Sequence, residues 1–298
     1  MKSITVFTPT YNRAYCLDQL YQSLVRQTVK DFSWLIIDDG STDTTKELVQ
    51  SWIEENKLEI HYHYKPNQGM HSGYNVAYEI IKTELSVCID SDDFMTDNAV
   101  EVILNHWSQF GTENHAGIIG LDCYKNGKVI GDSIPQNLTE STIGEFNWIL
   151  GIKGDKKLVY RTDVMKKYPA YPIFANEKFV PLDGKPIMAD QDYKMLTLNQ
   201  VLCVVEYMED GSTKNIIKSY LKNPKGFAYS RKLRMKYSPS SKDRFRNAVH
   251  YVSSAIISKN TKFLQESPKK VLTIFAIPFG VLLYGYILFS NKFDKKNN

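Results

Sequence analysis

The sequence predicts an α/β protein with a mostly parallel sheet, and three observations support this fold class. Short apolar runs alternate with amphipathic helical patterns along residues 1–110. The spacing of these segments is that of strand–helix–strand units, which place parallel strands side by side. The length of 298 residues and the hydrophobic content of 43% suit one large domain with an appendage, and they exclude a disordered chain. A mean hydropathy of -0.34 excludes a multi-span membrane protein.

Four strands and three helices are expected in this first part of the chain. The strands are predicted at 4–8, 33–38, 58–64 and 85–90. The helices are predicted at 16–27, 44–56 and 72–82. The first helix has Leu17, Leu20 and Leu24 at helical spacing, and Ser72 is a plausible cap for the third.

The pattern becomes mixed after residue 110. Strands are expected at 116–124, 128–130, 157–161 and 201–207, and a helix is expected at 162–168. Asn126 and Gly127 form a hairpin signal between the first two of these strands. Pro169 ends the helix.

Basic residues gather near the C-terminus. The window 211–246 holds 11 Lys/Arg and one acid, Asp243, and so carries +10 in a chain whose net charge is +4. The uncharged stretch 271–290 follows, and its 20 residues match the length that spans a bilayer. Pro278 interrupts it, so a membrane span, an in-plane interfacial helix and a buried core helix all remain open. Near an anionic leaflet each Lys or Arg contributes about 1 kcal/mol, which favours membrane association.

The compartment is expected to be cytosolic. The four cysteines lie far apart, and three of them sit in apolar runs, as reduced core thiols do. The apolar run at 4–8 is too short for a signal peptide. Together with the C-terminal pattern, these features predict a protein at the cytoplasmic face of the cell membrane.

Polar residues follow three of the predicted strands at their carboxyl ends. These segments are 8–13 (TPTYNR), 38–41 (DDGS) and 90–93 (DSDD). In an open parallel sheet, ligands bind beyond the carboxyl ends of the strands. Gathered carboxylates need a cation, and a hard divalent ion is the natural partner. The DDGS segment by itself also suits a turn and a helix start.

Other sites are excluded by their own requirements. A calcium loop beginning at Asp90 fails because Phe94 and Met95 occupy positions that need an oxygen ligand and a glycine. The sequence contains no GxGxxG after the first strand, no GxxxxGK[ST] and no HExxH. A metal-bridged phosphate ligand over acidic strand ends remains.

The same motifs resemble those of the family 2 glycosyltransferases, which are inverting, nucleotide-sugar-dependent enzymes with the GT-A fold. The matching segments are 5–13 (TVFTPTYNR), 27–28 (QT), 34–43 (WLIIDDGSTD), 67–69 (NQG) with Asn75, and 90–93 (DSDD). The resemblance covers residues 1 to about 125. The stretch 157–226 looks like the bacterial branch that builds capsular and other surface polysaccharides.

The resemblance implies a site for a UDP-sugar donor and for Mn²⁺ or Mg²⁺. The donor-site residues that it implies are Pro9, Tyr11, Asn12, Asp38, Asp39, Asn67, Gly69, Asn75, Asp90 and Ser91. Asp39 would accept a hydrogen bond from uracil. Asp92 would ligate the metal that bridges the donor diphosphate, with Asp93 beside it. Such a metal stabilises the charge that develops on the leaving group.

Inversion by a single displacement also needs a group that takes the proton of the acceptor hydroxyl. The resemblance places an acid at the start of a helix past the mid-chain strand. Glu177 is the first candidate, and Asp183, Asp190 and Asp192 are the others.

The sequence therefore predicts a catalytic domain at 1–213, with a nucleotide-binding half (1–110) and an acceptor half (111–213), and a membrane-associating region at 214–298. We expect transfer of one sugar from a UDP-sugar to a polyprenyl-diphosphate-linked saccharide in bacterial surface polysaccharide synthesis. The alternatives are transfer directly to polyprenyl phosphate and an inactive membrane-associated scaffold of the same fold. Nucleic-acid binding is not expected, because the basic window comes with no reading helix and no aromatic platform.

Overall fold

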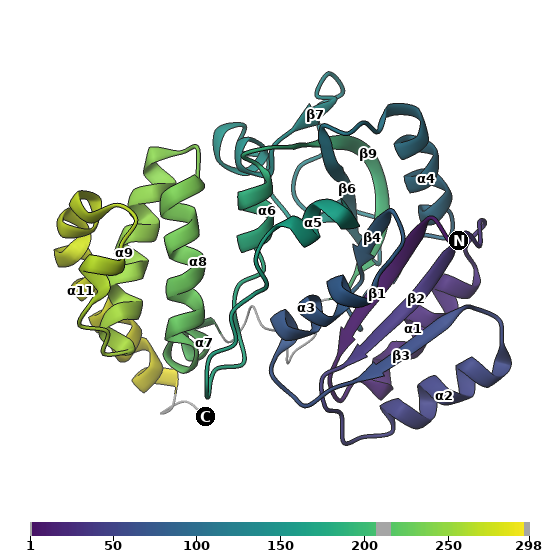
Figure 1. The fold of residues 1–298 in the computed structure, drawn as a ribbon, viewed down its shortest axis with the longest axis horizontal. Helices are drawn as coiled ribbons and strands as arrows, with labels where there is room; N and C mark the ends of the chain where they lie inside the picture. The colour runs from purple at the N-terminus through teal and green to yellow at the C-terminus, as the bar shows by residue number, and fades with distance from the viewer. Residues whose placement is uncertain (1, 207–215, 295–298) are drawn as a thin grey trace.

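The computed structural model describes residues 2–206 and 216–294, which form an α/β part followed by a group of helices (Figure 1). The strands are β1 (Ile4–Thr10), β2 (Phe32–Asp38), β3 (Ile60–Tyr64), β4 (Leu85–Cys88), β5 (Phe94–Met95), β6 (His115–Tyr124), β7 (Glu140–Ser141), β8 (Lys156–Arg161) and β9 (Lys194–Val205). The helices are α1 (Ala14–Val25), α2 (Thr45–Glu55), α3 (Met70–Ile80), α4 (Ala99–Phe110), the π-helical turn η1 (Glu145–Ile149), α5 (Thr162–Lys167), α6 (Gly184–Ala189), α7 (Ile216–Lys222), α8 (Pro224–Tyr237), α9 (Ser241–Ile257), α10 (Phe263–Glu266) and α11 (Lys270–Asp294).

The strands form one mixed sheet in the order β3-β2-β1-β4-β8-β6-β9-β5, with β7 beside β9. The first four strands of this order are parallel, as the sequence predicts. Strand β8 is antiparallel to both of its neighbours, β4 and β6. A strand from the second half of the chain therefore lies beside the acidic segment that follows β4.

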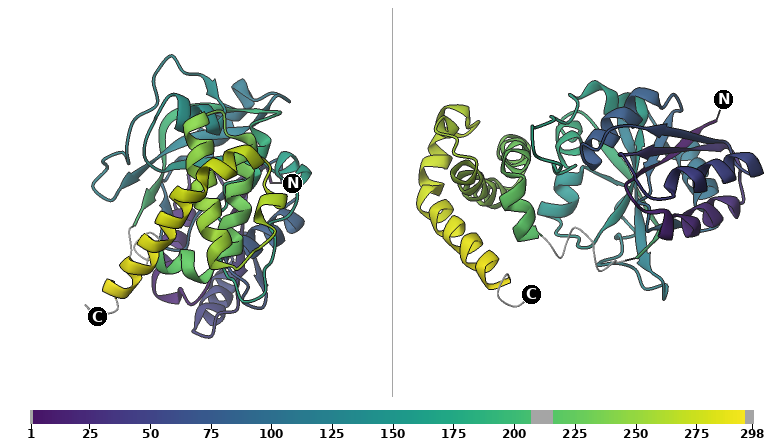
Figure 2. Two further views of the ribbon diagram at one scale, coloured as in Figure 1. Left: turned by 90° about the vertical axis from the view of Figure 1, so that its left-hand side faces the viewer. Right: turned by 90° about the horizontal axis from the view of Figure 1, so that it is seen from below.

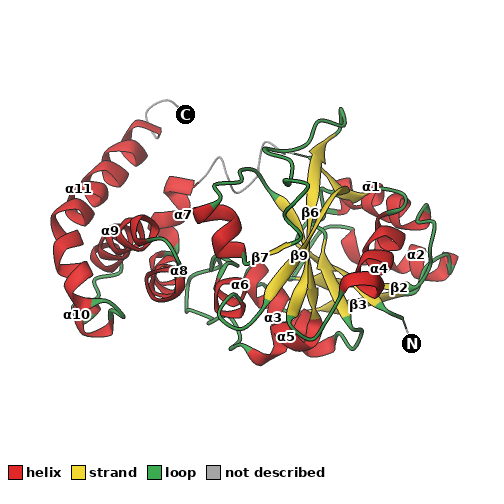
Figure 3. Cartoon of the chain, turned by 90° about the horizontal axis from the view of Figure 1, so that it is seen from above, coloured by secondary structure: helices red, strands yellow, loops and turns green. Residues whose placement is uncertain are grey.

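Helices cover both faces of the sheet (Figure 3). Helices α1, α2 and α4 pack on one face, where Trp34 of β2 lies in the same core as Tyr21 and Trp52. Those last two rings stack with their centroids 4.4 Å apart. Helix α3 covers the other face, where Ala77 packs on Phe7. Strands buried on both faces have continuous apolar sequences, which is why their positions could be predicted.

The register brings the ends of these strands to one edge. Thr10 pairs with Asp38, and Phe7 pairs with Cys88. The residues after β1, β2 and β4 therefore leave the sheet on the same side.

Two predictions about the second half need correction. The expected strand at 128–130 is reduced to one isolated bridge between Cys123 and Val129. The strand expected at 201–207 begins earlier, at Lys194, and ends at Val205. Its first half was missed because Gln200 and Asn199 are exposed and break the apolar run.

The C-terminal helices have a core of their own, formed by Met235 of α8, Tyr251 and Val252 of α9 and Ala276 of α11. Figure 2 shows this group at one end of the molecule, with α11 outermost. Helix α11 contains the predicted apolar segment, and it is long and apolar enough to cross a membrane by length and composition alone. The predicted domain boundary at 213/214 lies outside the described residues.

Candidate active site

A cleft of about 1000 Å³ opens at the edge of the sheet where β1, β2 and β4 end. Seven of the predicted donor and metal residues line it, and these are Pro9, Tyr11, Asp39, Asp90, Ser91, Asp92 and Asp93. They come from three separate segments of the sequence, which the parallel register brings together. Thus the structure forms one cavity from the motifs that the sequence predicts to act together.

The Asp39 carboxylate is buried and held from three sides. It accepts hydrogen bonds from the backbone N–H of Gln68 at 3.0 Å and of Gly69 at 2.7 Å. It also forms an ion pair with the buried ammonium group of Lys65. The same ammonium group donates to the Ser72 hydroxyl at 2.8 Å, at the start of α3. Lys65 could not be predicted as a site residue, because a single lysine after a strand has no recognisable sequence pattern.

Gly69 has a steric reason to be glycine. Its φ of +94° lies in the region that side chains rarely adopt, and a Cβ atom there would lie 1.9 Å from the carbonyl oxygen of Lys178. Gly69 therefore lets the loop before α3 approach the 178 segment while its N–H faces Asp39. Gly69, a predicted donor-site residue, therefore acts through its backbone N–H group, which donates to Asp39.

Five of the ten predicted donor residues, Gly69 and four others, do not line the cleft in the described part of the chain. Asp38 accepts from the Ser41 N–H at 2.7 Å and from the Tyr62 hydroxyl at 2.6 Å. The Asn12 carboxamide oxygen accepts from the Thr42 N–H at 2.8 Å. These two side chains stabilise the loops that carry Tyr11 and Asp39, so they support the cleft without lining it.

Asn75 and Asn67 differ from each other in their surroundings. The Asn75 carboxamide bonds both to the carbonyl oxygen and to the N–H of Tyr171, each at 2.8 Å, so it ties α3 to a distant loop. The Asn67 Oδ1 atom is buried and has no hydrogen-bond partner among the described residues.

Further polar atoms near Asp39 are buried without a partner in the part of the chain that the structure describes. They are Thr10 Oγ1 and both ring nitrogens of His71. Burial lowers the pKa of His71, which keeps the ring neutral at pH 7. Buried polar groups are normally hydrogen-bonded, so this corner of the site has unused capacity for a polar ligand.

A buried lysine lies beside the acidic motif at residues 90–93. Lys157 of β8 has its Nζ atom 3.9 Å from Asp93 Oδ2 and 3.8 Å from Asp122 Oδ1. Asp93 Oδ1 accepts from the N–H of Glu206 at 3.1 Å. Burial raises the pKa of Asp93 to about 7, and the Lys157 charge opposes that rise. The sequence analysis missed both Lys157 and Asp122, because each reads as an ordinary residue of a strand.

Carboxylate oxygens are the donors that Mn²⁺ and Mg²⁺ prefer, so Asp92 and Asp90 suit such an ion by their chemistry. Asp93 is a poorer donor, since its two oxygens face Glu206 N–H and Lys157. Among the described residues, no three His, Cys, Asp or Glu side chains gather closely enough to hold a metal. A bound ion would therefore need oxygens from a ligand as well.

The four acids predicted as candidates for the catalytic base lie away from the cleft lining in the described ranges. The Glu177 oxygens accept from the N–H groups of Lys225 at 3.1 Å and Gly226 at 2.9 Å, at the start of α8. Asp183 accepts from the Ser230 hydroxyl at 2.8 Å and pairs with Arg234.

The remaining acids of this segment differ in exposure. Asp192 accepts from the Tyr168 hydroxyl at 2.8 Å and lies at the surface. Asp190 accepts from the N–H groups of Ile143 and Gly144, and burial raises its pKa to about 6. The cleft itself is lined by Asp155, which the sequence analysis did not select.

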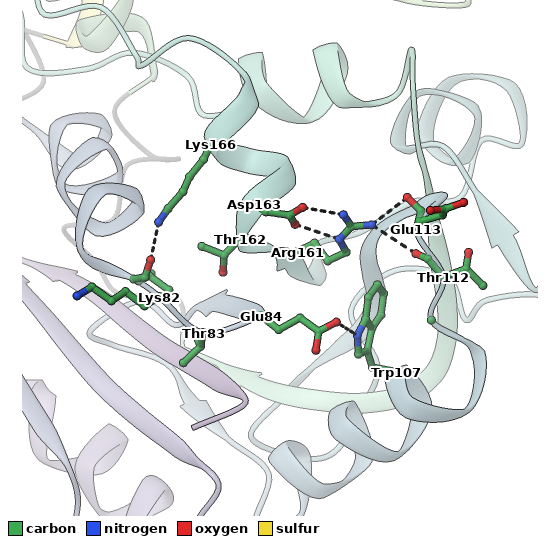
Figure 4. A pocket seen from close by; sticks show the side chains of 12 residues that line it. Lys82, Thr83, Glu84, Trp107, Thr112, Glu113, Arg161, Thr162, Asp163 and Lys166 are labelled. Atoms are coloured by element: carbon green, nitrogen blue, oxygen red, sulfur yellow. Dashed lines mark hydrogen bonds and ion pairs between the residues drawn. The ribbon is translucent and has the colours of Figure 1, made fainter. Parts of the chain in front are cut away.

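A second cavity of about 550 Å³ lies at the opposite edge of the sheet (Figure 4). Several of its charged groups already have partners, because Arg161 pairs with Asp163 and the Trp107 indole donates to Glu84 at 2.7 Å. It contains none of the motifs, so the cleft remains the candidate active site.

The model of the family "Glycosyl transferase family 2" matches residues 5–168, more than half of the chain. The chain belongs to glycosyl transferase family 2. The sequence-based prediction of this family is confirmed. An uncharacterized glycosyltransferase of Haemophilus influenzae is 30% identical over 115 residues, which are 39% of this chain and 44% of that protein.

A second relative is the poly(ribitol-phosphate) beta-N-acetylglucosaminyltransferase TarS of Staphylococcus aureus. It is 24% identical over 187 residues, 62% of this chain and 30% of that protein. The chain thus spans less than half the length of these curated relatives.

Solved structures confirm the GT-A fold of this family 2 member. S. aureus TarS 1–349 in complex with UDP-GlcNAc matches with a TM-score of 0.61 and 16% identity, over 98% of this chain and 92% of that one. GalNAc-T7 with UDP, GalNAc and Mn²⁺ matches with a TM-score of 0.62 and 14% identity, over 89% and 54% of the two chains.

Proposed function

We propose that this family 2 glycosyltransferase transfers a single sugar from a UDP-sugar to a saccharide acceptor, with inversion at the anomeric carbon. The cleft carries the proposal, because Pro9, Tyr11 and Asp39 line it together with the acidic motif. A base pocket beside a diphosphate site is the arrangement that a nucleotide sugar requires. The complexes of TarS with UDP-GlcNAc and of GalNAc-T7 with UDP support a uridine nucleotide as donor.

Within the cleft, Asp92 would hold Mn²⁺ or Mg²⁺ together with the donor diphosphate, and Asp90 and Ser91 would contact the ribose side. The metal, when bound, stabilises negative charge on the leaving nucleoside diphosphate. The Mn²⁺ in the GalNAc-T7 structure supports a divalent ion. Asp93 would position the motif through its contacts with Glu206 N–H and Lys157.

The residue that accepts the proton of the acceptor hydroxyl is proposed from the four predicted acids. Asp192 is favoured, because its partner among the described residues is a neutral hydroxyl and its carboxylate is exposed. Glu177 is held by two backbone N–H groups and Asp183 by a guanidinium group, so the oxygens of both carboxylates already make structural contacts.

For the acceptor, we propose a polyprenyl-diphosphate-linked saccharide at the cytoplasmic face of the cell membrane, in surface polysaccharide synthesis. The basic window 211–246 and the apolar α11 support a location where such lipids reside. Incubation with a labelled UDP-sugar and either polyprenyl-diphosphate-linked saccharide or polyprenyl phosphate separates this proposal from direct transfer to the lipid phosphate.

Titration calorimetry with UDP, with and without Mn²⁺, tests the donor site. We expect UDP binding that Mn²⁺ strengthens, and loss of that effect in Asp92→Ala. Asp97→Ala is the matched control, because Asp97 is exposed and pairs with Arg26 away from the cleft. Binding of GDP in place of UDP would contradict the proposed donor. No binding of either nucleotide would favour the inactive scaffold.

A further inference from the structure

Helix α11 has two faces that are both apolar but differ in burial. Thr273, Ala276, Gly280 and Ile287 are buried. The opposite face carries an apolar stripe, which we define as Val271, Phe275, Phe279, Leu282 and Tyr286. Between 52% and 71% of each of these five residues is exposed. Their spacing of three and four residues places them on one side of a helix.

The buried face is a close contact with α9. A Cβ atom on Gly280 would lie 2.5 Å from Val252, so only glycine permits this approach. Phe279, at the edge of the apolar stripe, also contacts α9, because its ring centroid lies 5.7 Å from that of Phe245. The middle of the apolar segment therefore contacts α9 both at Val252 and at Phe245, which lies in the N-terminal half of that helix.

That half of α9 is charged. Lys242, Asp243, Arg244 and Arg246 all lie within three residues of Phe245. If α11 crossed a bilayer while packed in this way, these charges would be carried toward the bilayer centre, where charged side chains are strongly unfavourable. The packing of α11 on α9 is therefore incompatible with a membrane span.

The ends of α11 identify the surface that the stripe fits. Lys269 and Lys270 are exposed at its start, and Lys292 follows the apolar segment in the sequence. The sequence contains no Asp or Glu from residue 267 to residue 293. An exposed apolar stripe between basic ends is complementary to anionic headgroups above acyl chains.

We propose that α11 lies in the plane of an anionic lipid surface, with the apolar stripe in the boundary between headgroups and acyl chains, and that it does not cross the bilayer. Figure 2 shows α11 on the outer side of the helical group, with α8 and α9 between it and the α/β part. The proposal deepens the membrane location given above but does not depend on the sugar donor.

Flotation of the full chain with vesicles tests the contact. We expect binding to vesicles of phosphatidylglycerol and phosphatidylethanolamine, and weaker binding to phosphatidylcholine alone. The double variant Phe275→Ser/Leu282→Ser should lower the partition coefficient about tenfold or more, because it removes two apolar anchors. The matched control is Phe110→Ser/Ile173→Ser, which changes two exposed apolar residues outside α11. Unchanged binding of the first variant would overturn the proposal.

The depth of α11 in the bilayer is measured with the variants Val271→Trp and Leu282→Trp in vesicles of brominated lipids. The quenching of each variant is compared with the quenching of the wild-type fluorescence. An in-plane helix predicts quenching of both by bromines near the headgroups. Deep quenching at 282 with shallow quenching at 271 would show a span and overturn the proposal. Two other results together would assign the stripe to a second copy of the chain instead. The first is a dimer mass in lipid-free solution that falls to a monomer mass in Phe275→Ser/Leu282→Ser, and the second is the absence of vesicle binding. UDP titration of the same variants reports on the donor site separately.

Discussion

The ammonium nitrogen of Lys157 lies 3.8 Å from a carboxylate oxygen of Asp122 in the interior of the sheet. The same nitrogen lies 3.9 Å from Asp93, in the acidic motif of the cleft. Lys157 reaches both because β8 is inserted between β4 and β6. A buried cation between two buried carboxylates offsets charges whose isolated burial would be unfavourable.

Replacing Lys157 by Met should therefore destabilise the fold strongly. The variant leaves Asp93 and Asp122 without their cation, and breaking a buried pair on one side costs about 3–5 kcal/mol. Urea unfolding measures the loss. The double variant Lys157→Met/Asp122→Asn should recover part of it, whereas Lys128→Met, at an exposed position, should change little. Equal stability of both lysine variants would contradict this role of Lys157.

Asp93 should make the stability of the metal-free protein depend on pH. Its pKa is raised by burial to about 7 from an ordinary 3.8, so the folded chain holds a proton between about pH 4 and 7 that the unfolded chain has lost. The free energy of unfolding therefore falls as pH rises through this window. Asp93→Asn does not titrate, so its stability relative to wild type should rise by about 2–4 kcal/mol from pH 4 to 7. If chemical denaturation gave the same pH dependence of the free energy of unfolding for wild type and Asp93→Asn, the raised pKa would be refuted.

Gly69→Ala should lower the free energy of unfolding by more than the strain of a positive φ alone explains. Its Cβ would meet the Lys178 carbonyl, so the loop that donates to Asp39 must move. Gly127→Ala is a control with a similar φ of +80° but open space around the new Cβ. The control should lose about 1 kcal/mol, whereas Gly69→Ala should lose more and also weaken UDP binding. The same loss in both variants would indicate that the contact with Lys178 is unimportant.

Glu177→Gln distinguishes a structural acid from a catalytic one. Gln keeps one acceptor oxygen and presents an NH₂ group to a backbone N–H, so we expect a loss of about 1–3 kcal/mol and a lower melting temperature. Asp192→Asn should leave the melting temperature unchanged and lower kcat. A Glu177→Gln variant with wild-type melting and abolished turnover would reverse the two assignments.

The centre of the parallel half of the sheet could be predicted, because β1 and β2 are buried on both faces and give continuous apolar runs. That topology brings the motifs at the carboxyl ends of the strands together, so Pro9, Asp39 and Asp92 could be predicted as neighbours in one cleft. These inferences use local patterns, one rule about strand ends and the resemblance to the family 2 glycosyltransferases, which implies the roles of the three residues.

Contacts between distant segments could not be predicted in this way. Lys157 lies in a short strand whose place between β4 and β6 depends on pairing across more than 70 residues. The role of Glu177 depends on two backbone N–H groups of α8, 48 and 49 residues away in the sequence. A single sequence has no signal for such contacts, because neither hydropathy nor spacing records which buried partner a charge will find.

The contacts of Glu177 and Asp183 with α8 affect how the chain can be shortened. Removing everything after residue 213 would take away the N–H groups of Lys225 and Gly226 and the side chains of Ser230 and Arg234. The Glu177 and Asp183 carboxylates would then lose these partners, and leaving them unsatisfied would be unfavourable unless water replaced the lost contacts. Helix α8 therefore behaves as the closing part of the catalytic unit. It could not be exchanged between relatives as an independent anchor, whereas the exposed apolar stripe of α11 could be redesigned without disturbing it.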